Sequence, residues 1–188
     1  MKNPVKIFFA VFLFAASVSL AQNDEDYSKY PGYFNFGSIS RFIKGDNVTE
    51  VNIDYHLLNL ISGLSQDNND GLAQVIRGLK LVKVYSFEVK PEDQKELLGK
   101  IIEMDESLKD RKWDRIVKVK EPDQFTFVFI KPSGNDKTIS GIVAVNYEKS
   151  GKATFVNIVG EINNKDIGKI ANKFNVPSFE GKDNKKDK

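Results

Sequence analysis

The sequence predicts an α+β fold, a single mixed, mostly antiparallel sheet of about six strands with helices packed mainly on one face. β-branched and aromatic residues alternate with polar ones over several short segments, and apolar residues recur at helical spacing between them. Short turns join the last four strand segments, which requires antiparallel neighbours. The expected order is β-α-β-α-β-β-β-β-α, in which the first helical connection permits one parallel pair.

The first half of the chain supplies two strands and the helical segments between them. Residues 50–54 alternate apolar and polar side chains, which predicts a short strand. Asp54 is positioned to cap a helix whose expected buried stripe is Leu57, Leu60, Ile61 and Leu64. Helical spacing resumes from Leu72 to Leu79, and residues 81–89 then follow the period of a second strand.

The second half begins with the clearest helix of the sequence. Pro91 suits the first turn of a helix, because its missing N–H needs no partner there. The expected buried stripe of this helix is Leu97, Leu98, Ile101, Ile102 and Leu108. Four strands are predicted after it, at residues 113–120, 124–131, 138–148 and 153–162. Asn163 or Asn164 is expected to cap a last helix with a stripe of Ile167, Ile170, Ala171 and Phe174.

The last two strands are predicted to form a hairpin with a two-residue turn at Ser150 and Gly151. This register puts Glu148 opposite Ala153 and sorts the side chains into two apolar faces. One face would hold Val143, Val145, Val156 and Ile158, and the other Ile142, Ala144, Phe155, Asn157 and Val159. Gly141 would lie opposite Gly160. Neither residue has a side chain, so another backbone, a helix or a ligand can approach the hairpin closely at this point.

The two ends of the chain are expected to lie outside the folded domain. A basic start, a short apolar stretch and small residues before position 22 predict a signal peptide at 1–21, cleaved after Ala21. Residues 22–29 are expected to be a flexible leader, 30–177 a single domain, and 178–188 a disordered tail. We therefore expect a periplasmic or secreted protein without stable membrane insertion after cleavage.

Composition excludes several classes of partner and cofactor. Removing Lys2 and Lys6 lowers the count of basic residues from 28 to 26, equal to the 26 acidic residues, which argues against a nucleic-acid partner. The chain has no cysteine, so it forms no disulfide or thiolate metal site and lacks the residue on which bacterial lipoproteins carry their lipid. We expect no cofactor and no metal site. The aromatic segment from Tyr30 to Ile43 is expected to pack over the edge of the core, the alternative being an exposed aromatic patch that binds a ligand.

The sequence resembles the bacterial exported family known as domain of unknown function 4252. The motifs that carry the resemblance are Pro31-Gly32-Tyr33 with Phe36, Val51 and Ile53 before Leu57-Leu58, Trp113 with Val117 and Val119, and the run from Phe155 to Ile162 leading to Lys173-Phe174. The resemblance spans about Tyr30 to Val176 and implies an exported envelope protein. It implies no activity, substrate or catalytic residue.

Asn157 is the most conspicuous polar residue, because it interrupts a strand otherwise built for burial. A buried amide must be hydrogen-bonded, so Asn157 either satisfies the backbone of a loop or lines a groove. In the second case the candidate ligand- or partner-binding residues are Asn157, Phe155, Asn146, Gly141 and Gly160.

Two patterns suggest other chemistry. Asp54 and His56, the only histidine, could form a dyad that activates a nucleophile, although Asp54 also suits a helix cap. Residues 67–71, Asp-Asn-Asn-Asp-Gly, suggest a calcium loop, but Gln66 and Arg77 occupy the positions where its first and last ligands belong.

The apolar character of both sheet faces favours a non-catalytic binding or interaction module of the cell envelope. Its expected partner is another envelope protein, a second copy of the chain or an apolar ligand. The alternatives are an envelope hydrolase that uses His56 with Asp54, and a structural or stress-protective envelope factor.

Overall fold

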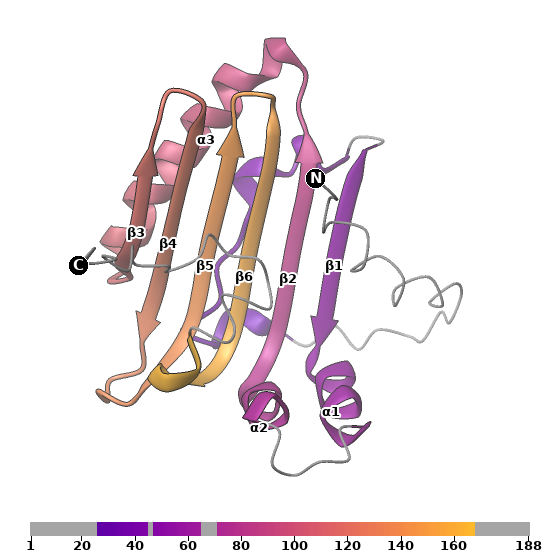
Figure 1. The fold of residues 1–188 in the computed structure, drawn as a ribbon, viewed down its shortest axis with the longest axis vertical. Coiled ribbons are helices and arrows are strands. Elements are labelled where there is room, and N and C mark those ends of the chain that lie inside the picture. Colours follow the sequence, from indigo (N-terminus) through magenta and orange to yellow (C-terminus); the bar gives the residue numbers. More distant parts are fainter. Residues whose placement is uncertain (1–25, 45–46, 65–70, 168–188) are drawn as a thin grey trace, which may run out of the picture.

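The computed structural model describes residues 26–44, 47–64 and 71–167. Its helices and strands are β1 (Val48–Asp54), α1 (Tyr55–Leu64), α2 (Gly71–Gly78), β2 (Leu79–Glu88), α3 (Pro91–Asp110), β3 (Asp114–Lys120), β4 (Gln124–Pro132), β5 (Thr138–Glu148) and β6 (Lys152–Asn163). The strands form one sheet in the order β1-β2-β6-β5-β4-β3 (Figure 1). Every pairing in this sheet is antiparallel, so the α+β class is confirmed, while the parallel pair that the first helical connection permitted does not form.

One face of the sheet, here called the first face, carries α3 and the segment 30–44, which we call the strap. Both lie behind the sheet in Figure 1. Phe34, Phe36, Ile39 and Phe42 of the strap are buried in one cluster with the aromatic side chains of the strands. The ring of Phe36 lies 5.7 Å from that of Phe155, which in turn stacks on Phe87 at 5.6 Å. The expectation that the aromatic segment packs over the core is confirmed.

The long helix α3 begins at Pro91, as predicted, with Glu92 and Asp93 in its first turn, where they complement the positive end of the helix dipole. The side chains that it buries are Leu97, Ile101, Met104, Asp105 and Leu108. Ile102, which was predicted to be buried, is 45% exposed. The prediction missed Asp105 because a carboxylate is rarely buried without partners, and two of its three partners, Arg115 and Lys118, come from β3.

The opposite face of the sheet, the second face, has a core of its own. It combines Leu58 of α1 and Val75 of α2 with strand side chains that include Val128, Ile142, Ala144, Val156 and Ile158. The prediction of which α1 residues are buried is wrong. Leu57, Leu60 and Ile61 are exposed, and Leu58 is buried instead. The helix contacts α2, β1 and β2, and among its residues 55–63 the buried side chains are those of Leu58 and Ser62.

The predicted register of the last hairpin is wrong by one position. Tyr147, rather than Glu148, lies opposite Ala153. The turn holds three residues, 149–151, and Gly151 adopts a φ of 98° while its N–H bonds to the carbonyl of Glu148 at 2.8 Å. A left-handed glycine that closes a three-residue loop is a standard alternative to a two-residue turn, and it adds one residue to the connection.

The corrected register changes which side chains share a face. Val143 and Val145 pack on the first face with Phe155, whereas Ile142 and Ala144 pack on the second face with Val156 and Ile158. Gly141 lies opposite Val159 rather than Gly160. Both faces remain apolar, because each strand still alternates between two buried sides.

The described chain ends just after β6. Asn163 caps the 3₁₀ turn Asn164–Asp166 by accepting a hydrogen bond from the Lys165 N–H at 3.0 Å. At the other end, Asp26 caps a similar turn, Tyr27–Lys29. The predicted signal peptide, residues 22–25 of the leader, most of the calcium-loop pattern, the last helix beyond Ile167 and the tail lie outside the described residues.

Candidate functional site

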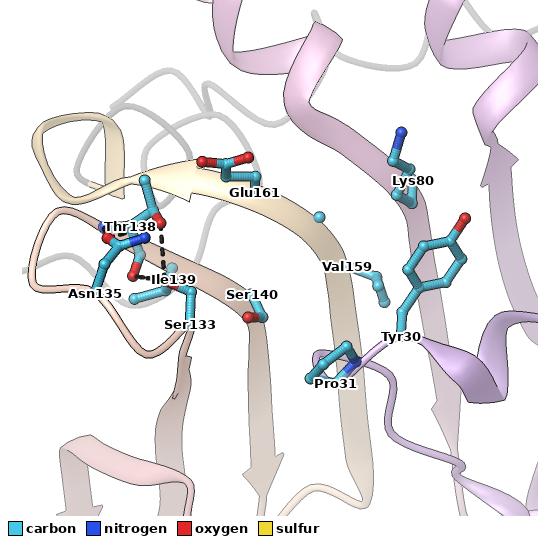
Figure 2. Close-up of a pocket in the computed structure, with 11 residues that line it drawn as sticks. Tyr30, Pro31, Lys80, Ser133, Asn135, Thr138, Ile139, Ser140, Val159 and Glu161 are labelled. Atoms are coloured by element: carbon cyan, nitrogen blue, oxygen red, sulfur yellow. Dashed lines mark hydrogen bonds between the residues drawn. The ribbon is translucent and has the colours of Figure 1, made fainter.

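A cleft of about 350 Å³ opens at one end of the sheet between the strap, β2, β5 and β6. Figure 2 shows its lining, with Tyr30 and Lys80 on one side and Thr138 and Ser140 on the other. The remaining lining residues are Pro31, Ser133, Asn135, Ile139, Val159, Gly160 and Glu161. A volume of this size suits a small molecule.

Two breaks in strand pairing, aligned across three strands, create the cleft. Between β2 and β6 the register shifts at Lys80, which is the extra residue of β2. Between β5 and β6 it shifts again, so that Gly160 and Glu161 lie against the single residue Ser140. A bulge bends its strand and re-aims the side chains beside it. All four of these residues line the cleft, so the two bulges together build it.

Gly160 permits the bulge through its conformation and its small size. Its φ of 143° is one that other residues rarely adopt, and a Cβ atom there would lie 2.4 Å from the carbonyl oxygen of Gly78. The predicted close approach at Gly160 is therefore made by the backbone at the junction of α2 and β2. Gly160 also lines the cleft.

The strap forms one wall of the cleft, and Asn157 holds the strap in place. The Asn157 Oδ1 accepts a hydrogen bond from the Phe34 N–H at 2.9 Å. Its Nδ2 donates to the carbonyl oxygens of Gly32 at 2.9 Å and Ile142 at 3.1 Å. Asn157 is fully buried. Of the two roles considered for this amide, the structure shows the first, in which it satisfies the backbone of a neighbouring segment.

The second contact of the strap is between glycines. A Cβ atom on Gly32 would lie 1.9 Å from the carbonyl oxygen of Ser140, and one on Gly141 would lie 2.7 Å from Gly32 Cα. Only glycine at both positions lets the two backbones meet this closely. The strap therefore crosses β5 at Gly141, and this crossing sets where Pro31 and Tyr30 stand at the cleft.

The predicted site residues do not form one group. Gly160 lines the cleft, and Asn157 and Gly141 position its wall. Phe155 is fully buried under the strap, among aromatic rings. Asn146 lies on the second face, where its Oδ1 accepts hydrogen bonds from Thr126 at 2.7 Å and Gln124 at 2.9 Å. The predicted proximity of Asn146 to Asn157 is wrong, because the two side chains leave the sheet on opposite sides.

The sequence matches the model of one known protein family. Residues 41–170, more than half of the 188, match the family described as Domain of unknown function (DUF4252). The chain belongs to this family. No curated protein and no solved structure matches it. The matched region of this DUF4252 protein includes Lys80, Ser140, Asn157 and Gly160, while Tyr30 and Pro31 of the cleft precede it.

The cleft of this DUF4252 protein offers both charges and hydrogen-bonding groups. Lys80 lies with its Nζ 4.3 Å from the centre of the Tyr55 ring, a cation–π contact that orients its ammonium group. Asn135 and Ser133 hold the turn between β4 and β5, since the Asn135 Oδ1 accepts from the Thr138 N–H and the Ser133 hydroxyl donates to the Thr138 carbonyl. Lys80 and Glu161, which carry opposite charges, both line the cleft. Sequence reasoning missed Lys80 and Ser140, because neither belongs to a recognisable motif.

Of the two residues of the possible dyad at the end of β1, Asp54 has a structural role. The Asp54 Oδ1 accepts a hydrogen bond from the Leu57 N–H at 2.8 Å, which caps α1 as the sequence indicated. His56 lies in the exposed first turn, with its ring 5.9 Å from that of Tyr55.

A buried carboxylate on the first face was not predicted from the sequence. Asp105 of α3 is 4% exposed and accepts hydrogen bonds from Arg115 at 2.9 Å, Lys109 at 3.3 Å and Lys118 at 3.4 Å. Burial favours its neutral form, but the hydrogen bonds from Arg115 and Lys109 outweigh burial and hold the pKa of Asp105 below its usual value. This cluster ties α3 to β3.

Neither a metal-binding cluster nor a membrane-spanning helix occurs in the described part of the chain. No three histidine, aspartate or glutamate side chains within it gather to hold a metal ion. None of its helices combines the length and the apolar character that a membrane crossing requires.

Proposed function

We propose that this DUF4252 protein is an exported, non-catalytic binding module of the cell envelope, and that the cleft between the strap and the bulged end of the sheet is its ligand site. The observation that carries the proposal is the alignment of two bulges across β2, β6 and β5, which directs Lys80, Ser140 and Glu161 to one hollow. Bulges are enriched beside functional sites because they re-aim side chains.

The wall of the cleft supports the same proposal. The strap is held beside the cleft by two hydrogen bonds of Asn157, to Phe34 and Gly32, and by the contact between Gly32 and Gly141. A wall held this firmly is pre-organised, which lowers the entropy lost when a ligand binds.

The lining indicates a ligand with mixed character. Pro31, Ile139 and Val159 provide apolar surface, while Lys80 and Glu161 provide charge. A small molecule with one apolar side and several hydrogen-bonding groups fits this lining better than a purely apolar ligand, because the charged side chains would otherwise lose hydration without gaining a partner.

Export to the envelope rests on the amino-terminal sequence. Lys2 and Lys6, the apolar stretch 7–20 and the small residues before position 22 have the order of a secretory signal.

Ligand-observed NMR with a panel of saccharides, short peptides and small amphiphiles would test the cleft. Two variants alter it: Lys80→Ala removes its cation, and Ser140→Leu fills it. The matched control is Lys152→Ala, which removes an exposed lysine from the far end of β6. We expect at least one panel member to bind the wild type and the control about tenfold more tightly than either cleft variant, a difference near 1.4 kcal/mol.

Two results would contradict the proposal. One is a complete absence of binding across the panel. The other is a ligand that binds the Lys80→Ala and Ser140→Leu variants as tightly as the wild type, since its site would then lie elsewhere. Thermal unfolding of each variant separates loss of binding from loss of fold.

A further inference from the structure

The two edges of the sheet differ in how they are protected against pairing. Edge strand β3 carries Arg115, Lys118 and Lys120, and its register with β4 is broken between Arg115 and Val117. Basic side chains and bulges are the usual devices that prevent an edge strand from pairing with another chain. The edge at β3 is therefore guarded.

The edge at β1 has no basic side chain and no bulge, and its charged residues are the two acids Glu50 and Asp54. Its sequence, Val-Thr-Glu-Val-Asn-Ile-Asp, contains no lysine, arginine or proline, and it pairs with β2 without a shift along all seven residues. Within the described residues, β2 is the only strand with which β1 pairs, and β1 ends the sheet (Figure 1). An unguarded regular edge is a template for a further strand.

The helix that follows β1 adds an apolar surface. In α1, Leu57 is 42%, Leu60 60% and Ile61 36% exposed. These residues recur at i, i+3 and i+4, so they form one exposed stripe of α1 beside the buried Leu58. An exposed apolar stripe directly after an unguarded edge is typical of an interaction surface.

We propose that a second copy of this chain pairs with β1 in antiparallel orientation, about a two-fold axis at Val51, so that two six-stranded sheets join into one. Val51 is the middle residue of β1, so this register lets all seven residues pair. The α1 helix of each copy then lies next to the start of the partner's β1, where its apolar stripe extends the contact.

The charges of β1 are compatible with this self-pairing. About Val51, Glu50 lies opposite Asn52 and Asp54 lies opposite Val48, so no two acids are directly opposite each other, and the nearest like charges are the two Glu50 side chains, which are diagonal neighbours. The chain also carries a formal net charge of only +2, so two copies repel each other little at long range. Self-complementarity of this kind favours a second copy over an unrelated partner.

A charge-pair experiment at Val51 tests both the interface and its symmetry. Each chain contributes Val51 at the axis, so Val51→Lys places two ammonium groups opposite each other, and Val51→Glu places two carboxylates. We expect light scattering with size-exclusion chromatography to show a dimer for the wild type and monomers for each variant alone. An equimolar mixture of the two variants should restore the dimer, because Lys then faces Glu.

Two further variants define the surface. Leu60→Glu, at the most exposed position of the stripe, should raise the dimer dissociation constant about tenfold. Ile116→Lys, on the guarded edge β3 at 37% exposure, is the matched control and should leave the dimer unchanged. Circular dichroism of each variant checks that it folds.

Three results would overturn the proposal. These are a wild type that stays monomeric up to millimolar concentration, Val51 variants that still form dimers when alone, and a variant mixture that stays monomeric although both chains fold. The first result would also overturn the proposal if β1 of the monomeric wild type pairs with a different envelope protein.

Discussion

Replacing Asn157 with alanine should destabilise the protein by roughly 3–5 kcal/mol, because three hydrogen bonds to backbone groups disappear together. Each contributes about 1 kcal/mol net, and the small cavity left behind adds to the loss. The Phe34 N–H and the Gly32 and Ile142 carbonyls would keep their buried positions without this partner.

The strap could avoid this cost only by detaching from the sheet. Detachment would expose Phe34, Phe36, Ile39 and Phe42, whose burial is worth roughly 1.5–3 kcal/mol each, or about 6–12 kcal/mol together. That exceeds the loss of three hydrogen bonds. We therefore expect the strap of the variant to stay on the first face while its anchoring near Gly32 loosens.

Urea unfolding and hydrogen exchange would measure these two effects. The midpoint should fall without a change in the m-value, since the surface exposed on unfolding is the same. The Phe34 amide should exchange faster than in the wild type. A loss below about 1 kcal/mol with unchanged exchange at Phe34 would refute the anchoring role of Asn157.

Two related variants sharpen the interpretation. Asn146→Ala removes the same type of side chain from the second face, where it contacts Thr126 and Gln124, so it should leave exchange at Phe34 unchanged. Asn157→Asp keeps the acceptor but places a carboxylate beside two carbonyl oxygens. Its folded-state pKa should lie above the unfolded value of about 3.9, so this variant should lose stability as the pH rises through that range.

Three other predictions concern the fold and the amino terminus. Asp105→Asn should cost about 2 kcal/mol at pH 7. Because the pKa of Asp105 is lowered in the folded state, its contribution is present above about pH 4 and fades on acidification, so urea unfolding at pH 3 should show a smaller difference. Gly151→Ala should destabilise the protein more than Gly134→Ala, since both glycines have positive φ but only a Cβ at Gly151 would meet backbone, at 2.5 Å; matching urea midpoints would contradict this. Amino-terminal sequencing of the protein from its native host should begin at Gln22; a chain that keeps Ala21 and the residues before it would refute cleavage there.

Part of the candidate site could be predicted from the sequence. Asn157 stood out because a single amide interrupts an apolar strand, and Gly141 and Gly160 because a strand interior rarely contains glycine. Lys80 and Ser140 gave no such signal. Each lies at a break in pairing with β6, and a bulge depends on the partner strand as much as on its own sequence.

The local pattern of side chains determined the strands, the long helix from Pro91, the apolar character of both sheet faces and the burial of the aromatic strap, because periodicity and burial follow from neighbouring residues alone. Tertiary structure decided the one-residue offset of the last hairpin, the rotation of α1 that exposes Leu57, Leu60 and Ile61, and the alignment of bulges that opens the cleft. These features depend on contacts between segments far apart in the chain, where small differences in packing choose among alternatives that the local sequence permits equally.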